Sequence, residues 1–337
     1  MPNNELVSIL MPVYNAENYL EACLGSICKQ LYPHWQLIAI NDFSTDKSKE
    51  LLQQFASREK RIQVYDNDSK GIIPALRKAF RFSSGNMITR MDADDIMHPA
   101  KLLEMTSLLK SQGKGHLITA YVSYFSENQL GEGYRRYAEW LNELAAKGKN
   151  FDEIYRECVI PSPCWLTYRS DLEHAGAFES DIYPEDYELC FRFRSINLKV
   201  RAVKKVLHYW RDHSHRTSRI SPDYADNSFL DLKLSYFLKE DYNKLERLIV
   251  WGAGRKGKYI AKNLREAGIE FHWITSNQKK LSVQIYGKSL DDASKFEFKT
   301  KDQLIWSIAQ KNATMHLEKL MVLNDRKALD LDIYRFC

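Results

Sequence analysis

The sequence predicts an α/β protein whose main domain is a doubly wound, mostly parallel sheet. Over residues 6–91, short apolar runs alternate with longer segments whose apolar residues recur every three or four positions. The first pattern is typical of buried strands and the second of helices that bury one face. A polar segment also follows each apolar run, at the place where α/β sheets bind their ligands.

Each element in this stretch has its own signal. Residues 6–12 form a near-continuous apolar run, as expected of a parallel strand covered on both faces. From Glu17 the apolar residues follow helical spacing, and Pro33 ends that helix. The same reasoning predicts strands at residues 6–12, 35–40, 61–65 and 86–91, and helices at residues 17–31, 47–57 and 73–82.

Four polar loops follow the carboxyl ends of the predicted strands. They are residues 14–15, 41–42, 66–71 and 92–95. Because the carboxyl ends of parallel strands lie along one edge of a sheet, we expect these loops to share one rim.

The loop at residues 91–95 (MDADD) is the most unusual, since three carboxylates lie within four positions and repel one another. It follows an apolar run and precedes His98-Pro99, which indicates a turn after a strand. Mg²⁺ or Mn²⁺ would compensate the charge, because these ions take oxygen ligands, commonly one or two carboxylates together with phosphate oxygens. A solvated acidic turn is the alternative, and the spacing alone does not choose between the two.

The composition sets outer limits on function. The chain has 337 residues, of which 44% are hydrophobic, and a net charge of +5, which suits anionic partners such as nucleotide phosphates or a phospholipid surface. No basic run is long enough to predict nucleic-acid binding. The six cysteines form no C-x-x-C pair, which argues against a zinc site or a disulfide framework and favours a reducing compartment. No apolar run reaches the roughly 18 residues of a transmembrane helix, and the first residues are too polar for a signal peptide.

Several short motifs occur in a fixed order along the chain. They are residues 11–15 (MPVYN), 40–46 (INDFSTD), 71–77, 91–95 (MDADD) with Pro99, Arg169, 176–178 (GAF), 184–186 (PED) and 210–213 (WRDH). Together they resemble the N-terminal half of the family-2 glycosyltransferases, the inverting enzymes of the GT-A fold, over residues 6–218. One such motif would carry little weight, but this many in the right order form a specific signal. The resemblance implies a GT-A domain, the doubly wound sheet of the nucleotide-diphospho-sugar transferases.

The resemblance assigns one group of residues to a nucleotide-sugar donor. Asp42 matches the aspartate that binds the base, and an ionised carboxylate, which only accepts hydrogen bonds, suits the N–H of uracil. Arg77 matches a residue that lies near the base. From the residues alone, Asp42 could also cap a helix and Arg77 could be a solvated surface charge. The residues implied for donor binding are Pro12, Tyr14, Asn15, Asp42, Arg77, Asp92, Ala93, Asp94, Arg211 and Arg216.

The resemblance assigns a second group to the metal and to the chemistry. Asp92 and Asp94 match the DXD pair that holds the ribose and a Mn²⁺ or Mg²⁺ ion, and His213 matches a histidine near the metal or the diphosphate. Asp186 matches the catalytic base, which takes a proton from the acceptor hydroxyl. Without the resemblance, Asp186 would be interpreted as a carboxylate that favours the helix dipole, and His213 as a surface histidine.

Three residues depart from the family pattern. Asn41 replaces the first residue of an Asp-Asp pair, Phe43 stands where glycine is usual, and Lys78 stands where asparagine often follows the arginine. None of these departures removes a group assigned to the chemistry, so we expect an active enzyme.

A second, smaller module is expected after the catalytic domain. Residues 248–257 form a strand, a G-x-G-x-x-G turn and a helix start, which is the context of a Rossmann-like unit. However, Ser276-Asn277 replaces the acidic residue that would bind a ribose, and fewer than 100 residues follow Leu248. We therefore expect no NAD(P) binding and favour an interaction, dimerisation or regulatory role. The expected domains are residues 1–222 (catalytic), 223–246 (helical linker) and 247–337 (Rossmann-like module, with later strands at 304–308 and 319–323).

The implied function is metal-dependent transfer of a sugar, with inversion, from a UDP-sugar to a hydroxyl of a glycan or lipid-linked acceptor in bacterial surface-polysaccharide synthesis. The protein would act in the cytoplasm or peripherally at the inner membrane face, and its C-terminal module could support a homo-oligomer. Two other functions stay open. A nucleotide-sugar-forming nucleotidyltransferase usually has a glycine-rich, basic loop where this chain has residues 13–15 (VYN). A non-catalytic nucleotide sensor would not need both Asp186 and the DXD pair.

Overall fold

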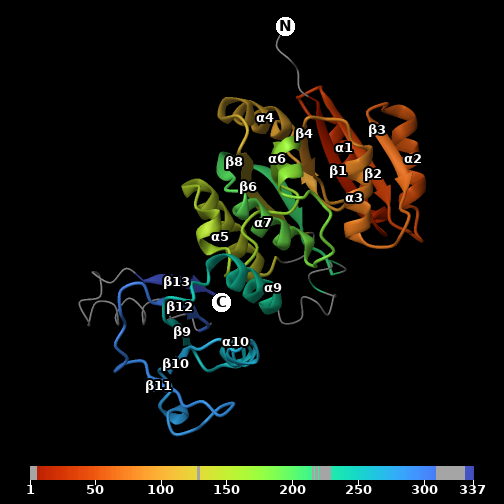
Figure 1. The fold of residues 1–337 in the computed structure, drawn as a ribbon. Helices are drawn as coiled ribbons and strands as arrows, with labels where there is room; N and C mark the ends of the chain where they lie inside the picture. The colour runs from red at the N-terminus through yellow and green to blue at the C-terminus, as the bar shows by residue number, and fades with distance from the viewer. Residues whose placement is uncertain (1–5, 127–129, 215, 217–218, 220–228, 309–330) are drawn as a thin grey trace. The chain divides into compact units, whose positions relative to one another are not determined.

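The computed structural model describes residues 6–126, 130–214, 216, 219, 229–308 and 331–337 (Figure 1). The chain divides into two compact units. The larger unit comprises Met1–Ile154 and Cys158–Arg216, and the smaller one Tyr155–Glu157 and Thr217–Cys337. The domain limits expected at residues 222 and 246 stay predictions, and residues 220–228, around the first of them, lie outside the described part of the chain.

The larger unit is built on an eight-stranded sheet of order β3-β2-β1-β4-β7-β6-β8-β5. Its parallel half consists of the strands expected from the apolar runs: β1 (Val7–Val13), β2 (Trp35–Asn41), β3 (Ile62–Asp66) and β4 (Met87–Arg90). β2 and β4 flank β1, and Val7 lies opposite both Trp35 and Met87. The predicted doubly wound sheet is thus confirmed, and the carboxyl ends of β1, β2 and β4 meet at one edge.

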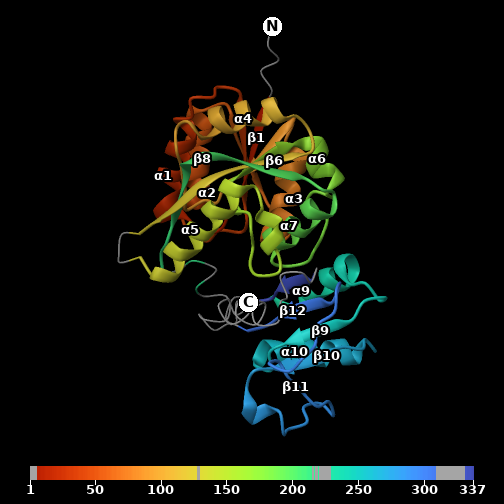
Figure 2. The ribbon, with the colours of Figure 1, turned by 90° about the vertical axis from the view of Figure 1, so that its left-hand side faces the viewer.

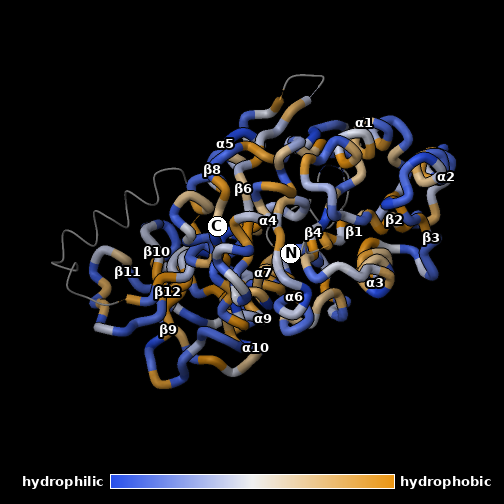
Figure 3. The backbone as a smooth tube through the Cα atoms, turned by 90° about the horizontal axis from the view of Figure 1, so that it is seen from above, coloured by the Kyte–Doolittle hydropathy of each residue, from blue (hydrophilic) through white to orange (hydrophobic). Residues whose placement is uncertain are grey.

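Helices cover both faces of this sheet. α1 (Glu17–Cys28), α2 (Ser48–Arg58) and α4 (Lys101–Gln112) share one hydrophobic core with the odd-numbered residues of β1, while α3 (Ile72–Phe82) lies on the opposite side (Figure 2). Hydrophobic and hydrophilic residues alternate along these helices, as Figure 3 shows for α1 and α3. Across the described residues of both units, no helix is long and apolar enough to cross a membrane.

α1 ends earlier than the apolar spacing predicts. Its last residue is Cys28 rather than Leu31. The N–H of Leu31 donates to the carbonyl of Pro99 at 2.9 Å instead of to a carbonyl of α1. The chain therefore leaves the helix to contact the segment that follows the acidic loop, and this contact overrides the helical pattern.

The second half of the sheet brings the acidic loop beside the end of a long strand. It contains β5 (Ile96–Met97), β6 (His116–Phe125), β7 (Trp165–Tyr168) and β8 (Lys199–Arg211). β7 is antiparallel to β4 and β6, whereas β6 and β8 are parallel. β5 directly follows the acidic loop and pairs with β8, with Ile96 opposite Tyr209. The residues after Arg211 therefore lie next to Asp92–Asp95. The helices of this half are α5 (Glu132–Lys147), α6 (Arg169–His174) and α7 (Glu185–Ser195).

The smaller unit has an all-parallel, five-stranded sheet of order β11-β10-β9-β12-β13. Its core includes Trp251, Ile274, Leu304 and Trp306. β13 was not predicted, and the strand expected at residues 319–323 lies outside the described residues. The Rossmann-like strand, turn and helix are present, which agrees with the predicted fold class. The elements are α9 (Leu230–Tyr236), β9 (Leu248–Trp251), α10 (Arg255–Glu266), β10 (His272–Thr275), β11 (Asp291–Asp292), β12 (Gln303–Trp306) and β13 (Asp332–Arg335).

The glycines of the G-x-G-x-x-G turn have a packing role. A Cβ atom at Gly257 would lie 2.0 Å from the carbonyl oxygen of Gly252, and Gly252 itself has a φ of 121°. The helix can therefore approach the end of β9 only without a side chain at residue 257. This explains the motif without any bound cofactor, and the absence of NAD(P) binding stays a prediction.

Replacing Gly257 by alanine should destabilise the smaller unit by about 1–3 kcal/mol, because the new methyl group collides with backbone rather than with a flexible side chain. Gly254→Ala is the matched control, since no atom lies within 4 Å of a Cβ built there. Hydrogen exchange of the β9 and α10 amides would measure the effect locally. Equal exchange rates in the two variants would contradict the packing role.

Candidate active site

The acidic loop after β4 gives each of its three carboxylates a different partner. Asp92 accepts a hydrogen bond from Nε of Arg90 at 3.0 Å. The Oδ2 atom of Asp94 lies 3.0 Å from Nε2 of His213. Asp95 is completely buried and has partners on β8. Each carboxylate of the loop thus has a partner of its own, and Asp94 and His213 lie face to face.

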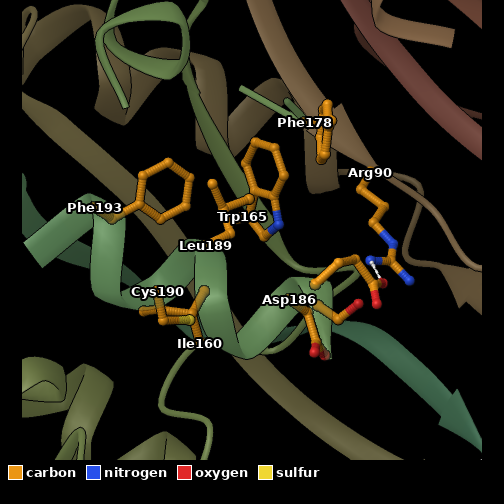
Figure 4. A pocket seen from close by; sticks show the side chains of 10 residues that line it. Arg90, Ile160, Trp165, Phe178, Asp186, Leu189, Cys190 and Phe193 are labelled. Atoms are coloured by element: carbon orange, nitrogen blue, oxygen red, sulfur yellow. Dashed lines mark hydrogen bonds and ion pairs between the residues drawn. The ribbon is translucent and has the colours of Figure 1, made fainter. Parts of the chain in front are cut away.

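Arg90 links this loop to the start of α7. Its side chain is buried, and Nη1 donates to Glu185 at 2.7 Å while Nε donates to Asp92. Arg90 and Asp186 line one small pocket together with Trp165 and Phe178 (Figure 4). Sequence reasoning missed Arg90, whose one signal was a charged residue inside an apolar strand.

Asp186 and Glu185 have different environments although they are adjacent. Glu185 is buried and paired with Arg90, whereas Asp186 is partly exposed and forms no ion pair with any described residue. The carboxylate is only partly exposed, and this partial loss of solvent raises the pKa of Asp186 to about 7; the Glu185 carboxylate acts in the same direction, and Arg90 opposes it. Asp186 lies in the first turn of α7, where a carboxylate also favours the helix dipole, and its Oδ1 accepts the N–H of Tyr187 at 2.8 Å. Asp186 is therefore able to accept a proton near neutral pH, and no ion pair with a described residue occupies it.

Asp42 holds two of the predicted rim loops together. Its carboxylate is buried and accepts the N–H of Gly71 at 2.9 Å and the amide Nδ2 of Asn67 at 2.8 Å. It does not cap α2, since that helix begins at Ser48, with Lys47 before it. The departure at Asn41 also has a local reason, because its amide Nδ2 donates to Asp66 at 2.9 Å, where an aspartate would be repelled.

The loops after β1 and β2 interlock through Asn15. Its side-chain oxygen accepts the N–H of Thr45 at 2.8 Å. Pro12 lies within β1. Tyr14 directly follows this strand and is half exposed, and the Nζ atom of Lys70 lies 4.6 Å from the centre of the Tyr14 ring. These three predicted donor residues therefore lie on the same edge as Asp42.

Arg77 does not behave as a solvated charge. Its Nε donates to the carbonyl of Phe178 at 3.0 Å, and its Nη2 donates to Asp181 at 2.8 Å and to the carbonyl of Glu179. The guanidinium thus ties α3 to the loop before α7. Its predicted position near a base stays a prediction.

Three predicted residues follow or end β8 beside the acidic loop. Nε of Arg211 donates to the carbonyl of Asp94 at 2.8 Å. The ring of His213 packs on Tyr19 at 4.4 Å, and the guanidinium of Arg216 lies over Trp210 at 5.0 Å. The Nδ1 atom of His213 and the Nη1 atom of Arg216 are buried and have no hydrogen-bond partner among the described residues.

The donor set fits a divalent cation that also binds phosphate. Within the described residues, no group of three or more His, Cys, Asp or Glu side chains is placed to hold a metal ion. Asp94 and His213 could supply two ligands, and Mg²⁺ or Mn²⁺ usually completes its shell with phosphate oxygens and water. The unsatisfied Nη1 of Arg216 is a donor suited to the same anion.

Comparisons with known proteins identify the family and the fold of the chain. The chain matches the family "Glycosyl transferase family 2" over residues 8–176. It is 27% identical over 230 residues to an uncharacterized glycosyltransferase of Haemophilus influenzae, covering 65% of this chain and 69% of that protein. It is 36% identical over 108 residues to the Escherichia coli UDP-Glc:alpha-D-GlcNAc-diphosphoundecaprenol beta-1,3-glucosyltransferase WfgD, covering 32% of this chain and 42% of WfgD.

Two solved structures share the fold. The Staphylococcus aureus TarS 1–349 complex with UDP-GlcNAc has a TM-score of 0.53 and 15% identity, and the match covers 83% of this chain and 76% of that one. The Pyrobaculum calidifontis mannosyltransferase PcManGT, in complex with GDP-Man and Mn²⁺, has a TM-score of 0.52 and 16% identity, over 70% of this chain and 64% of that one. At such identities the likeness shows the fold alone. The family match extends over half of the chain, and we conclude that this chain belongs to glycosyltransferase family 2 and has the GT-A fold.

Proposed function

We propose that the protein transfers a sugar, with inversion, from a UDP-sugar to a hydroxyl group of a glycan or lipid-linked acceptor. The observation that carries the proposal is the contact of Arg90 with both Asp92 and Glu185. It joins the loop assigned to the donor diphosphate to the helix start that carries Asp186. A single displacement needs this proximity, since the base must lie across the anomeric carbon from the leaving nucleotide.

UDP is the nucleotide that the rim supports best. Asp42 can only accept hydrogen bonds when ionised, and it already orders the loop at Asn67 and Gly71. An acceptor at this place matches the N–H of uracil. Two similar proteins support the same nucleotide, because WfgD is named for UDP-Glc and TarS 1–349 was solved in complex with UDP-GlcNAc.

Asp94 and His213 would hold a Mn²⁺ or Mg²⁺ ion, with Asp92 beside them on the ribose side. When bound, such an ion supplies charge stabilisation to the diphosphate that leaves. The similar PcManGT structure contains Mn²⁺. Arg211 and Arg216 add fixed positive charge on the same rim, and Arg211 is held in place by the carbonyl of Asp94.

Asp186 would act as the base. Its carboxylate accepts the proton of the acceptor hydroxyl as the oxygen attacks the anomeric carbon. Glu185 remains paired with Arg90, which keeps the second carboxylate out of the reaction and fixes the helix start. A pKa of about 7 matches this task, because general bases are most effective when their pKa is near the working pH.

The biological setting is a further part of the proposal. WfgD is named for a diphosphoundecaprenol-linked acceptor, which supports a lipid-linked acceptor and a role in bacterial surface-polysaccharide synthesis for this chain. We place the protein in the cytoplasm or at the inner membrane face, with the smaller unit as an interaction, dimerisation or regulatory module.

UDP should bind with at least tenfold higher affinity in Mn²⁺ than in EDTA, because Asp92 and Asp94 repel a diphosphate in the absence of a cation, and a tenfold change corresponds to about 1.4 kcal/mol. Titration calorimetry with UDP, and with GDP as the control nucleotide, measures both the metal effect and the base preference. Equal UDP affinity in Mn²⁺ and EDTA would contradict the metal role. Tighter binding of GDP would contradict the role of Asp42 but not that of the metal.

The transfer rate should rise with pH and level off near pH 7. Below this pH Asp186 is protonated and cannot accept the acceptor's proton, so kcat/KM should fall about tenfold per pH unit. The charged groups that face Asp186 are Glu185, Arg90 and Asp92. Glu185→Gln removes a negative neighbour, lowers the pKa of Asp186 and should move the profile to lower pH. A flat profile in the wild type, measured by nucleotide release at saturating Mn²⁺, would rule out Asp186 as the titrating base.

A further inference from the structure

A buried chain of three polar side chains lies beneath the acidic loop. Lys101, the first residue of α4, is fully buried, and its Nζ donates to the carbonyl of Pro163 at 2.7 Å. The same Nζ lies 3.0 Å from Nδ1 of His208, a fully buried residue of β8. Nε2 of His208 lies 2.9 Å from Oδ2 of Asp95. Lysine is almost never completely buried unless it is paired, so this arrangement needs a reason.

The chemistry of the three groups defines the direction of the chain. An ammonium group has only donors, so Nδ1 of His208 must accept and Nε2 must carry the hydrogen that it donates to Asp95. Burial and the nearby Lys101 hold the pKa of His208 well below its usual value, which agrees with a neutral imidazole. Burial lowers the pKa of Lys101 and raises the pKa of Asp95, so it acts against both charges. The two charges oppose each other through a neutral ring, and the buried chain is neutral as a whole.

Asp95 connects the buried chain of Lys101 and His208 to the residues at the edge of the sheet. Its Oδ1 accepts the backbone N–H of Arg211 at 2.8 Å, and Nε of Arg211 in turn donates to the carbonyl of Asp94 at 2.8 Å. Asp95 therefore fixes the end of β8 against the loop after β4. Asp94 is the neighbour of Asp95 in sequence, and His213 lies two residues after Arg211. The two contacts therefore hold the side chains of Asp94 and His213 close together, with Oδ2 and Nε2 3.0 Å apart.

We propose that Lys101 and His208 are positioning residues for donor binding: through Asp95 and Arg211 they fix the Asp94–His213 pair at which the metal and the diphosphate bind. Asp95, the third carboxylate of the loop, is then an anchor whose charge is balanced from below, and it is not a ligand. This inference rests on the proposed function.

The test compares two substitutions at residue 208. In His208→Gln the amide can still accept from Lys101 and donate to Asp95. His208→Leu breaks the link between the two charges and leaves Lys101 only the carbonyl of Pro163 and Asp95 only the N–H of Arg211 from the contacts described above. Lys101→Met removes the ammonium and keeps most of the stem. We expect His208→Leu and Lys101→Met to raise the Mn²⁺ concentration for half-maximal activity and the Kd of UDP in Mn²⁺ by roughly 10–100-fold, the usual effect of groups that orient metal ligands. His208→Gln should stay within about threefold of the wild type, and the KM for the acceptor should not change in any of them.

A structural loss alone would give a different pattern. Thr119→Val removes another buried hydrogen bond of the same sheet, from Oγ1 of Thr119 to the carbonyl of Cys164, and should lower stability without changing the Mn²⁺ or UDP affinity. Measurements are made at a temperature at which circular dichroism shows each variant to be folded. If Lys101→Met does not fold, the comparison of the Mn²⁺ and UDP affinities of His208→Gln and His208→Leu decides alone.

The outcomes separate the inference from the proposed function. Wild-type protein that binds no UDP in Mn²⁺ would overturn the proposed function. Wild-type binding together with unchanged affinity in His208→Leu and Lys101→Met would overturn the positioning role. A Gln variant as weak as the Leu variant would overturn the hydrogen-bonded link from Lys101 to Asp95 as the cause of the positioning.

Discussion

Asp186→Asn will reduce the rate of sugar transfer by a factor on the order of 10²–10⁴, the usual contribution of a general base, while the affinity for UDP and Mn²⁺ stays within about twofold. The substitution keeps the size and shape of the side chain and removes its ability to take up a proton. Asp186 forms no ion pair with a described residue, so its loss leaves the Arg90–Glu185 and Arg90–Asp92 contacts intact. Donor binding therefore has no reason to change.

Glu185→Gln is the matched control for this experiment. It changes the adjacent carboxylate in the same way, but that carboxylate is already occupied by Arg90 at 2.7 Å. It should retain most of the transfer rate at alkaline pH. Transfer and UDP affinity are measured on the same preparations. Near-full transfer by Asp186→Asn together with a severe loss in Glu185→Gln would assign the base to Glu185, and a parallel loss of UDP affinity in Asp186→Asn would show that Asp186 serves the donor instead.

The strands of the larger unit could be predicted because each depends on its own residues. β1 and β2 are near-continuous apolar runs, as expected of strands covered on both faces. The edge on which the loops meet then follows from parallel topology. Where a contact with another segment determines the end of an element, the periodicity predicts the wrong end. α1 is the example, because the N–H of Leu31 donates to the carbonyl of Pro99 and the helix ends before it.

The partners of the charged residues could not be predicted. Arg90 and Glu185 are 95 residues apart in sequence, and His208 and Asp95 are 113 apart. The periodicity of a sequence indicates which face of an element is buried. It does not indicate which charged residue from a distant part of the chain will form an ion pair or hydrogen bond with that element. Lys101 illustrates this, since at the start of an amphipathic helix it would be expected in solvent, and the packing of α4 against β6, β7 and β8 buries it. The resemblance assigned Asp94 and His213 to the metal, and these roles stay predictions, whereas nothing in the sequence indicated that Lys101 and His208 lie beneath them.

Asp94→Asn should remove the effect of the metal on nucleotide binding rather than nucleotide binding itself. In Mn²⁺, we expect the Kd of UDP to rise by roughly 10–100-fold and transfer to fall in parallel, because the metal serves both the bound donor and the leaving diphosphate. In EDTA, the variant should bind UDP as well as the wild type or better, because a negative charge facing the diphosphate has been removed. For a metal ligand, the affinity for UDP therefore falls in Mn²⁺ and does not fall in EDTA. A general loss of structure would lower the affinity in both titrations.

The contrast with two other carboxylates makes the result specific. Asp152→Asn removes an equal charge from an exposed residue outside the acidic loop and should leave both titrations unchanged. Asp92→Asn removes one of the two carboxylates paired with Arg90 and leaves its ion pair with Glu185. The charge at the rim then changes without the metal, so UDP affinity should change in EDTA as well as in Mn²⁺. A Mn²⁺ enhancement that survives intact in Asp94→Asn would move the metal away from the Asp94–His213 pair. The ligand would then have to be sought at Asp92, since Asp95 is buried with both oxygens already bonded to His208 and the N–H of Arg211.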